Sequence, residues 1–322
     1  MTQQTNNKYI TGIHHITALA DDAQRNIDFY PGILGLRMIK KTVNFDDPGV
    51  YHLYYGDETG TPGSILTFFP YAGIGEGRKG NGLVNTTTFS VPYDAIGYWE
   101  NRFKQYGVAY KPVQERFEGE PYLYFEDPDG LPLELVFTEQ DNRQPFTYGH
   151  VPLDYAIRGF FSAELWVSDQ GPTAALLTDV LGHQLVAEAD GRYRFAASQM
   201  PGKYIDLRVS PAAGPGINGS GTIHHIAFST PDQSTQLKVR EAVQSFGMRP
   251  TPVIDRQYFR SVYFREPSGV LFEVATEGPG FAIDEPMAAL GEELKLPPQY
   301  EERRDQIEKM LDPVEINLNS YQ

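Results

Sequence analysis

The sequence predicts an α+β fold in which four modules, each a strand, a helix and three further strands, pair into two incomplete β-barrels flanked by helices. The first observation is an internal repeat: residues 82–92 align without a gap on 221–231, and residues 124–134 align on 263–273. Both alignments have an offset of 139 residues (221 − 82 and 263 − 124). The second observation is that each module opens with a strand-like segment and continues with a helical stretch that ends near a glycine.

The modules follow one another along the chain. They span about 10–70, 82–138, 157–210 and 221–276. Their predicted helices are residues 23–34, 95–106, 172–181 and 234–246, and the glycines that end them are Gly35, Gly107, Gly182 and Gly247. Short strands then follow, separated by turn signals such as Asp-Pro-Asp-Gly at 127–130.

This order suggests a division into domains. We expect the first two modules to form an N-terminal domain, 8–140, and the last two a C-terminal domain, 155–277. A polar, proline-bearing stretch separates them. The repeat stops after residue 277, and the tail, 278–322, contains a predicted amphipathic helix at 299–311. We expect this tail to act as a clamp or a lid.

The composition excludes several classes of function. Lys and Arg number 27 and Asp and Glu number 42, which gives a net charge of −15. Nucleic acids and anionic membranes are recognised through basic contacts, so neither is an expected partner. The chain has no cysteine, which excludes disulfides, zinc ribbons, iron–sulfur clusters and thiol nucleophiles. The polar N-terminus and the lack of an apolar run of about 20 residues favour a soluble cytoplasmic protein.

Two histidine pairs, His14-His15 and His224-His225, open strands of the same module type. Since side chains alternate across a strand, one histidine of each pair faces a given side, and the apolar alternation assigns the second histidine to the concave face. Glu273 lies in an otherwise apolar last strand, where a carboxylate is costly unless it is paired or binds a metal. Two histidines and one carboxylate are the donor set of a non-haem Fe(II) site. The predicted ligands are therefore His15, His225 and Glu273.

The repeat supplies an internal control for this prediction. Glu134 is the repeat counterpart of Glu273, but Thr86 stands where His225 would be, and Phe161-Ser162 stands where His14-His15 would be. The first and fourth modules are therefore expected to build one metal cup, and the second and third a cup without metal. A lone histidine on a strand is more often an ordinary polar residue than a ligand. No chemistry is assigned to the three histidines outside the pairs, which are His52, His150 and His183.

These features resemble the vicinal oxygen chelate superfamily, which includes glyoxalase I and the extradiol dioxygenases. Segments 12–17, 51–63, 77–80 and 269–273 look most like (chloro)hydroquinone 1,2-dioxygenases and the ring-cleaving dioxygenases of quinone resistance. The resemblance implies Fe(II), with Mn(II) as an alternative, at His15, His225 and Glu273. It also implies that five further residues serve catalysis around the metal, namely His14, Thr17, His224, Arg256 and Tyr263.

The implied activity is ring cleavage of a hydroquinone-type aromatic diol next to a hydroxyl-bearing carbon, with both atoms of O₂ incorporated. His224 and Tyr263 are candidates for proton transfer and Arg256 for anion stabilisation. One alternative is a glyoxalase-like isomerase or lyase, but such sites carry a second metal-bound carboxylate, and Thr67 stands at that position. The other is a non-catalytic protein that binds a small aromatic. The ring substituents, a preference for hydroquinone over catechol and assembly into a homo-oligomer stay open.

Overall fold

The computed structural model describes residues 9–197 and 202–321. The first module contains β1 (Gly12–Ala20), α1 (Ala23–Ile27), the π-helical turn η1 (Asp28–Ile33), β2 (Arg37–Val43), β3 (Tyr51–Gly56) and β4 (Ile65–Pro70). The second contains β5 (Leu83–Val91), η2 (Tyr93–Ala95), α2 (Ile96–Tyr106), β6 (Gln114–Glu115), β7 (Pro121–Glu126) and β8 (Pro132–Phe137). All four predicted opening strands and helices are present.

The second half repeats this plan. The third module contains β9 (Gly159–Val167), α3 (Gly171–Ala175), η3 (Leu176–Val180), β10 (Gln184–Ala189), β11 (Arg192–Ala196) and β12 (Tyr204–Val209). The fourth contains β13 (Thr222–Thr230), α4 (Gln233–Ser245), β14 (Ile254–Asp255), β15 (Phe259–Arg265) and β16 (Leu271–Pro279). The tail adds η4 (Phe281–Ile283), η5 (Met287–Ala289), η6 (Pro298–Arg303), α5 (Arg304–Glu308) and η7 (Leu318–Tyr321).

Within the described residues, the strands form two eight-stranded sheets. The first sheet has the order β14-β15-β16-β13-β1-β4-β3-β2 and joins the first module to the fourth. The second sheet has the order β10-β11-β12-β9-β5-β8-β7-β6 and joins the second module to the third. Antiparallel pairs β1–β13 and β5–β9 form the two seams. The predicted fold class is confirmed, and so is the prediction that the first and fourth modules build one cup and the second and third modules the other.

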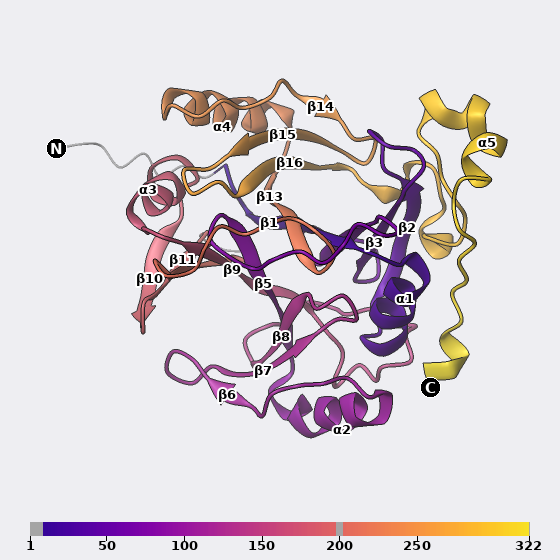
Figure 1. Ribbon diagram of the computed structural model, residues 1–322, viewed down its shortest axis with the longest axis horizontal. Coiled ribbons are helices and arrows are strands. Elements are labelled where there is room, and N and C mark those ends of the chain that lie inside the picture. The colour runs from indigo at the N-terminus through magenta and orange to yellow at the C-terminus, as the bar shows by residue number, and fades with distance from the viewer. Residues whose placement is uncertain (1–8, 198–201, 322) are drawn as a thin grey trace.

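The helices lie outside the sheets. Figure 1 shows α4 beside β15 and β16, and α2 beside β7 at the opposite end of the view. Trp99 and Phe103 on α2 and Val239 and Val243 on α4 are fully buried. Helix α2 ends at Gly107 in the left-handed conformation, with φ of 68°, as the sequence predicts. Each sheet contains strands from both 8–140 and 155–277, so the sheets do not separate these two ranges. The division into two domains therefore stays a prediction from the sequence repeat.

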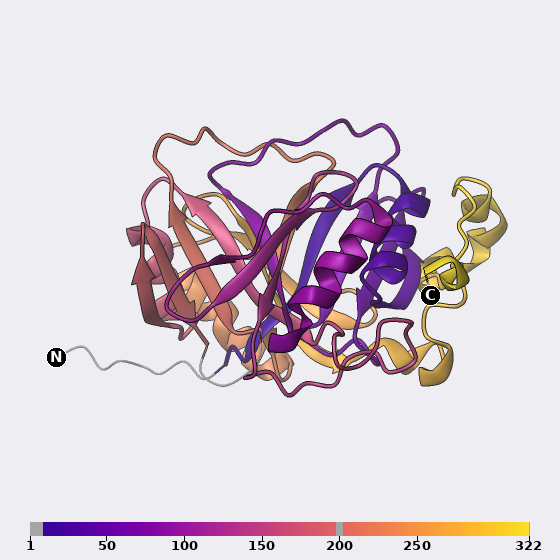
Figure 2. The ribbon, with the colours of Figure 1, turned by 90° about the horizontal axis from the view of Figure 1, so that it is seen from below.

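The C-terminal tail follows the first module. Both Figure 1 and Figure 2 show it beside α1 and β2, at the end of the molecule. The Lys40 ammonium is completely buried and pairs with Glu285 and, at 2.7 Å, with Asp284 of the tail. The hydroxyl of Tyr300 donates to the carbonyl of Phe45 at 2.8 Å. The tail therefore clamps the first module and holds the loop after β2. Among the described residues, no helix has the length and apolar character needed to cross a membrane.

Candidate metal centre

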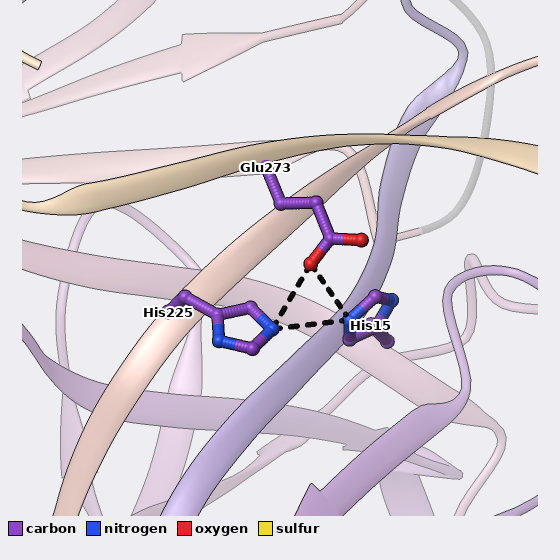
Figure 3. A group of neighbouring side chains, drawn as sticks. All are labelled: His15, His225 and Glu273. Atoms are coloured by element: carbon purple, nitrogen blue, oxygen red, sulfur yellow. Dashed lines mark hydrogen bonds and ion pairs between the residues drawn. The ribbon is translucent and has the colours of Figure 1, made fainter. Parts of the chain in front are cut away.

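The three predicted ligands meet in the first sheet. His15 lies on β1, His225 on β13 and Glu273 on β16, which are adjacent strands. Nε2 of His225 lies 3.0 Å from Oε2 of Glu273, and Nε2 of His15 lies 3.3 Å from the same oxygen. The two Nε2 atoms are 3.3 Å apart. Figure 3 shows the three side chains pointing toward one another, so their donor atoms face a common point.

The electrostatics of this group favour the protonation states that bind metals. Glu273 is completely buried. Burial opposes its ionisation, but His15 and His225 outweigh that effect and hold the pKa of the carboxyl well below its usual range. Burial lowers the pKa of His225, although Glu273 opposes that shift. An ionised carboxylate and a neutral imidazole are therefore present near pH 7, as a divalent metal requires.

The residues present fit a divalent metal ion. The Ser261 hydroxyl donates to Oε1 of Glu273, whereas Oε2 is buried beside Nε2 of His15 and Nε2 of His225, and has no donor when those two nitrogens are unprotonated. A buried carboxylate oxygen without a donor is costly, and a cation at the point shared by the three donor atoms would satisfy it. Two imidazole nitrogens and one carboxylate oxygen are the donor set of a facial triad, which leaves coordination positions open to other ligands.

His14 and His224 each contact the histidine ligand that follows them in the sequence. Nδ1 of His14 is 3.0 Å from Nδ1 of His15, and Nδ1 of His224 is 2.8 Å from Nδ1 of His225. A histidine that binds a metal through Nε2 carries its proton on Nδ1, and a partner at that atom fixes the ring. Burial lowers the pKa of both His14 and His224 to about 3, helped by their histidine neighbours, so each can accept this bond as a neutral ring.

A cavity of about 360 Å³ opens at the ligands and is large enough for a small aromatic molecule. Aromatic rings form much of its wall, namely Phe45, Tyr54, Phe69, Tyr71, Phe259 and Tyr263. Its polar lining, apart from the ligands His15 and His225, comes from Asn44, Asp46, His52, His224, Thr251 and Arg256. The site thus combines a flat apolar surface with a few hydrogen-bonding groups.

The structure brings Arg256 and Tyr263 to the cavity and places Thr17 apart from its lining. Nε of Arg256 donates to the Tyr263 hydroxyl at 3.3 Å, and its Nη2 lies 3.0 Å from Oδ2 of Asp46. Burial raises the pKa of Tyr263, and Glu273 raises it further, so this phenol keeps its proton. Thr17 is completely buried, and its hydroxyl lies 2.8 Å from that of Thr67. Thr67, at the position of a second carboxylate in glyoxalase-like sites, supplies only a hydroxyl.

The second cup, which has Ser162 and Thr86 at the positions equivalent to His15 and His225, contains a group of ion pairs. Arg116 donates to Glu134, the repeat counterpart of Glu273, at 2.5 Å and to Glu120 at 2.7 Å. Arg194 pairs with Asp206 at 2.7 Å and also with Glu120. The cation that compensates Glu134 is therefore a guanidinium.

Sequence reasoning missed His52 and Tyr54. Both line the cavity, and the Tyr54 hydroxyl lies 2.9 Å from Nδ1 of His52. His52 is a lone histidine without a histidine counterpart in the repeat, so the pattern that revealed the ligands could not identify it. The usable signal was strand alternation, because residues 52 and 54 face the same side of β3. His150 and His183 do not line this cavity.

Known proteins resemble this chain over most of its length. A sequence model of the Glyoxalase/Bleomycin resistance protein/Dioxygenase superfamily matches residues 12–135 and 159–274. MhqO of Bacillus subtilis strain 168, named as a ring-cleaving dioxygenase, is 47% identical over 309 residues, covering 96% of this chain and 98% of MhqO. The chlorohydroquinone/hydroquinone 1,2-dioxygenase of Sphingobium indicum is 34% identical, with 95% of this chain and 98% of that protein covered.

Solved structures give the same result for the fold. A crystal structure described as a dioxygenase from Bacillus subtilis superposes with a TM-score of 0.92 at 46% identity and covers 96% of this chain and 99% of that one. Glyoxalase I from Zea mays superposes with a TM-score of 0.61 at 15% identity, covering 83% of this chain and 92% of that one. Because its sequence identity is only 15%, the maize enzyme supports the fold but not the reaction.

Proposed function

The chain belongs to the Glyoxalase/Bleomycin resistance protein/Dioxygenase superfamily, and from this premise we propose that it is a metal-dependent dioxygenase that cleaves the ring of hydroquinone-type aromatic diols next to a hydroxyl-bearing carbon. The observation that carries the proposal is the convergence of three donor atoms within 3.3 Å of one another at an aromatic-walled cavity. The names of MhqO and of the Sphingobium indicum enzyme support the reaction class.

His15, His225 and Glu273 would hold the metal, which we propose to be Fe(II), with Mn(II) as the alternative. A bound Fe(II) supplies an electron-transfer route between an aromatic diol and O₂. The chain itself supplies the cavity that positions the two reactants. The rings of Phe69 and Phe259 offer flat apolar contact to an aromatic substrate and limit the access of water.

Three polar side chains would manage protons and charge. If His225 binds the metal through Nε2, its Nδ1–H donates to Nδ1 of His224, and the proton of neutral His224 then lies on Nε2 as a donor. Tyr263 keeps its phenolic proton, because its pKa is raised, and can donate it as a hydrogen bond. Arg256 is a permanent cation at the cavity wall and would stabilise a phenolate or another anion that develops there.

The test is anaerobic reconstitution with Fe(II), followed by oxygen-electrode traces with hydroquinone, methylhydroquinone and catechol. We expect oxygen uptake with the hydroquinones in the wild type and its loss in Glu273→Gln, which removes the anionic ligand without changing the size of the side chain. Metal binding is measured separately as a shift of the unfolding midpoint with Mn(II). Binding of the metal without oxygen uptake on any of the three diphenols would contradict the proposal.

A further inference from the structure

A chain of four hydrogen-bonding groups runs from inside the first sheet to the cavity. The Thr17 and Thr67 hydroxyl oxygens are 2.8 Å apart, and that of Thr67 lies 2.9 Å from Nε2 of His52. Nδ1 of His52 lies 2.9 Å from the Tyr54 hydroxyl. His52 and Tyr54 line the cavity, whereas the two threonines are completely buried. This series of hydrogen bonds therefore ends at Tyr54, on the cavity wall.

The second sheet shows that the fold does not require this series of hydrogen bonds between uncharged side chains. Thr17 pairs with Thr67 in β1 and β4, and Tyr54 pairs with Thr67 across β3 and β4. In the second sheet, the residues at the equivalent strand positions are Glu164, Asp206 and Arg194, which correspond to Thr17, Thr67 and Tyr54. Asp206 lies opposite Glu164 on one neighbouring strand and opposite Arg194 on the other.

In the second cup these positions carry ion pairs. Arg194 bonds Asp206 at 2.7 Å, and Arg192, which corresponds to His52, bonds Glu164 at 2.5 Å. The cup that lacks the histidine ligands is thus closed by fixed charges. The metal cup instead carries uncharged groups that can reverse their hydrogen bonds.

The hydrogen bonds among these four groups can run in two opposite senses. If Thr67 donates to Thr17, neutral His52 donates from Nε2 to Thr67 and accepts from Tyr54 at Nδ1, so the Tyr54 oxygen can accept a bond from a ligand. If Thr17 donates to Thr67 and Thr67 to Nε2, then Nδ1–H donates to Tyr54, and the Tyr54 O–H can donate to a ligand. Within the described residues, the Tyr54 hydroxyl has no hydrogen-bond partner besides His52.

We propose that the Tyr54 hydroxyl is a further substrate-contacting group, which bonds an oxygen of the aromatic alcohol, and that His52 is its positioning residue. Tyr54 accepts from a neutral phenol and donates to a phenolate, so its hydroxyl can bond both ionisation states of the substrate. The proposal rests on the proposed function for the identity of the ligand, an aromatic alcohol, and not for the turnover of that ligand.

The test is an anaerobic titration of the Mn(II)-loaded protein with hydroquinone, in which calorimetry measures the binding affinity. Tyr54→Phe should weaken hydroquinone binding roughly tenfold, because one hydrogen bond to the ligand is lost. Tyr55→Phe is the matched control, since the Tyr55 hydroxyl bonds Asn26 and does not line the cavity. Equal affinity in Tyr54→Phe and Tyr55→Phe would overturn the proposal.

The positioning role of His52 has its own measurements. His52→Leu should weaken binding as Tyr54→Phe does, whereas His52→Gln should restore it, because an amide can accept from Tyr54 and donate to Thr67. Nitrogen NMR of the metal-free protein should show neutral His52 whose Nδ1 shift changes in Tyr54→Phe and not in Tyr55→Phe. Thr67→Val interrupts the chain without touching Tyr54 and should weaken binding too.

The outcomes separate this inference from the proposed function. Weaker hydroquinone binding in Tyr54→Phe, together with no oxygen uptake by the wild type, would refute the dioxygenase and leave the role of Tyr54 standing. Oxygen uptake by the wild type, together with unchanged hydroquinone binding in Tyr54→Phe, would support the dioxygenase and refute the role of Tyr54. Failure of His52→Gln to restore binding would refute the positioning role of His52.

Discussion

Removing Arg116 alone should destabilise the protein by about 3–5 kcal/mol, because it leaves a buried carboxylate without its cation. Its side chain is 5% exposed and donates to Glu134 and Glu120. Burial already raises the pKa of Glu134 against the opposing effect of Arg116, so Arg116→Met forces this group either to take up a proton or to stay charged without its arginine.

The double variant Arg116→Met with Glu134→Leu should recover most of that loss. The network of ion pairs joins two arginines to three carboxylates, a formal charge of −1, and consists of Arg116, Arg194, Glu120, Glu134 and Asp206. After both substitutions one arginine faces two carboxylates, so the formal charge is again −1. Replacement of a complete buried pair by apolar side chains is often neutral or stabilising by about 1–4 kcal/mol.

Urea denaturation at pH 7 measures both effects, with circular dichroism as the probe. A double-mutant cycle with Glu134→Leu gives the coupling free energy between the two residues. The reasoning fails if Arg116→Met costs less than about 1 kcal/mol, or if the double variant is as unstable as Arg116→Met.

Two further predictions concern stability away from the metal centre. Burial lowers the pKa of His183 from 6.5 to about 4, so this residue should contribute up to about 3 kcal/mol to the fall in unfolding free energy as pH drops through this window. His183→Gln should make that part of the pH profile shallower, with the rest of the slope coming from groups such as His14 and His224, and an unchanged slope would exclude a contribution from His183. Lys40→Met leaves Glu285 buried without its cation and should speed proteolysis of the tail; equal cleavage rates would contradict the clamp.

The repeat explains why much of the fold could be predicted. The helices at 95–106 and 234–246 appear as α2 and α4 within one or two residues, because helical periodicity and a terminal glycine are local signals. The helix predicted at 299–311 is shorter and less regular than expected, because it consists of the 3-10 helix η6 and the five-residue helix α5. Pairing of β1 with β13, more than 200 residues away, was predictable only from the histidine pairs.

The candidate site divides in the same way. His15, His225 and Glu273 were predictable because the repeat supplied counterparts that lack the histidines. His52 was not, because its counterpart is Arg192 and its role depends on contacts across β3 and β4. Sequence spacing also could not show that Arg116 supplies the cation at Glu134.

The most direct test of the dioxygenase proposal is the stoichiometry of the Fe(II)-loaded protein with hydroquinone in a closed oxygen-electrode cell. Oxygen consumption, hydrogen peroxide and the aromatic proton signals of the substrate are followed together. We predict one O₂ consumed for each aromatic ring lost, without hydrogen peroxide, and no reaction in Glu273→Gln. Oxidation to benzoquinone, with the ring intact and hydrogen peroxide released, would contradict ring cleavage.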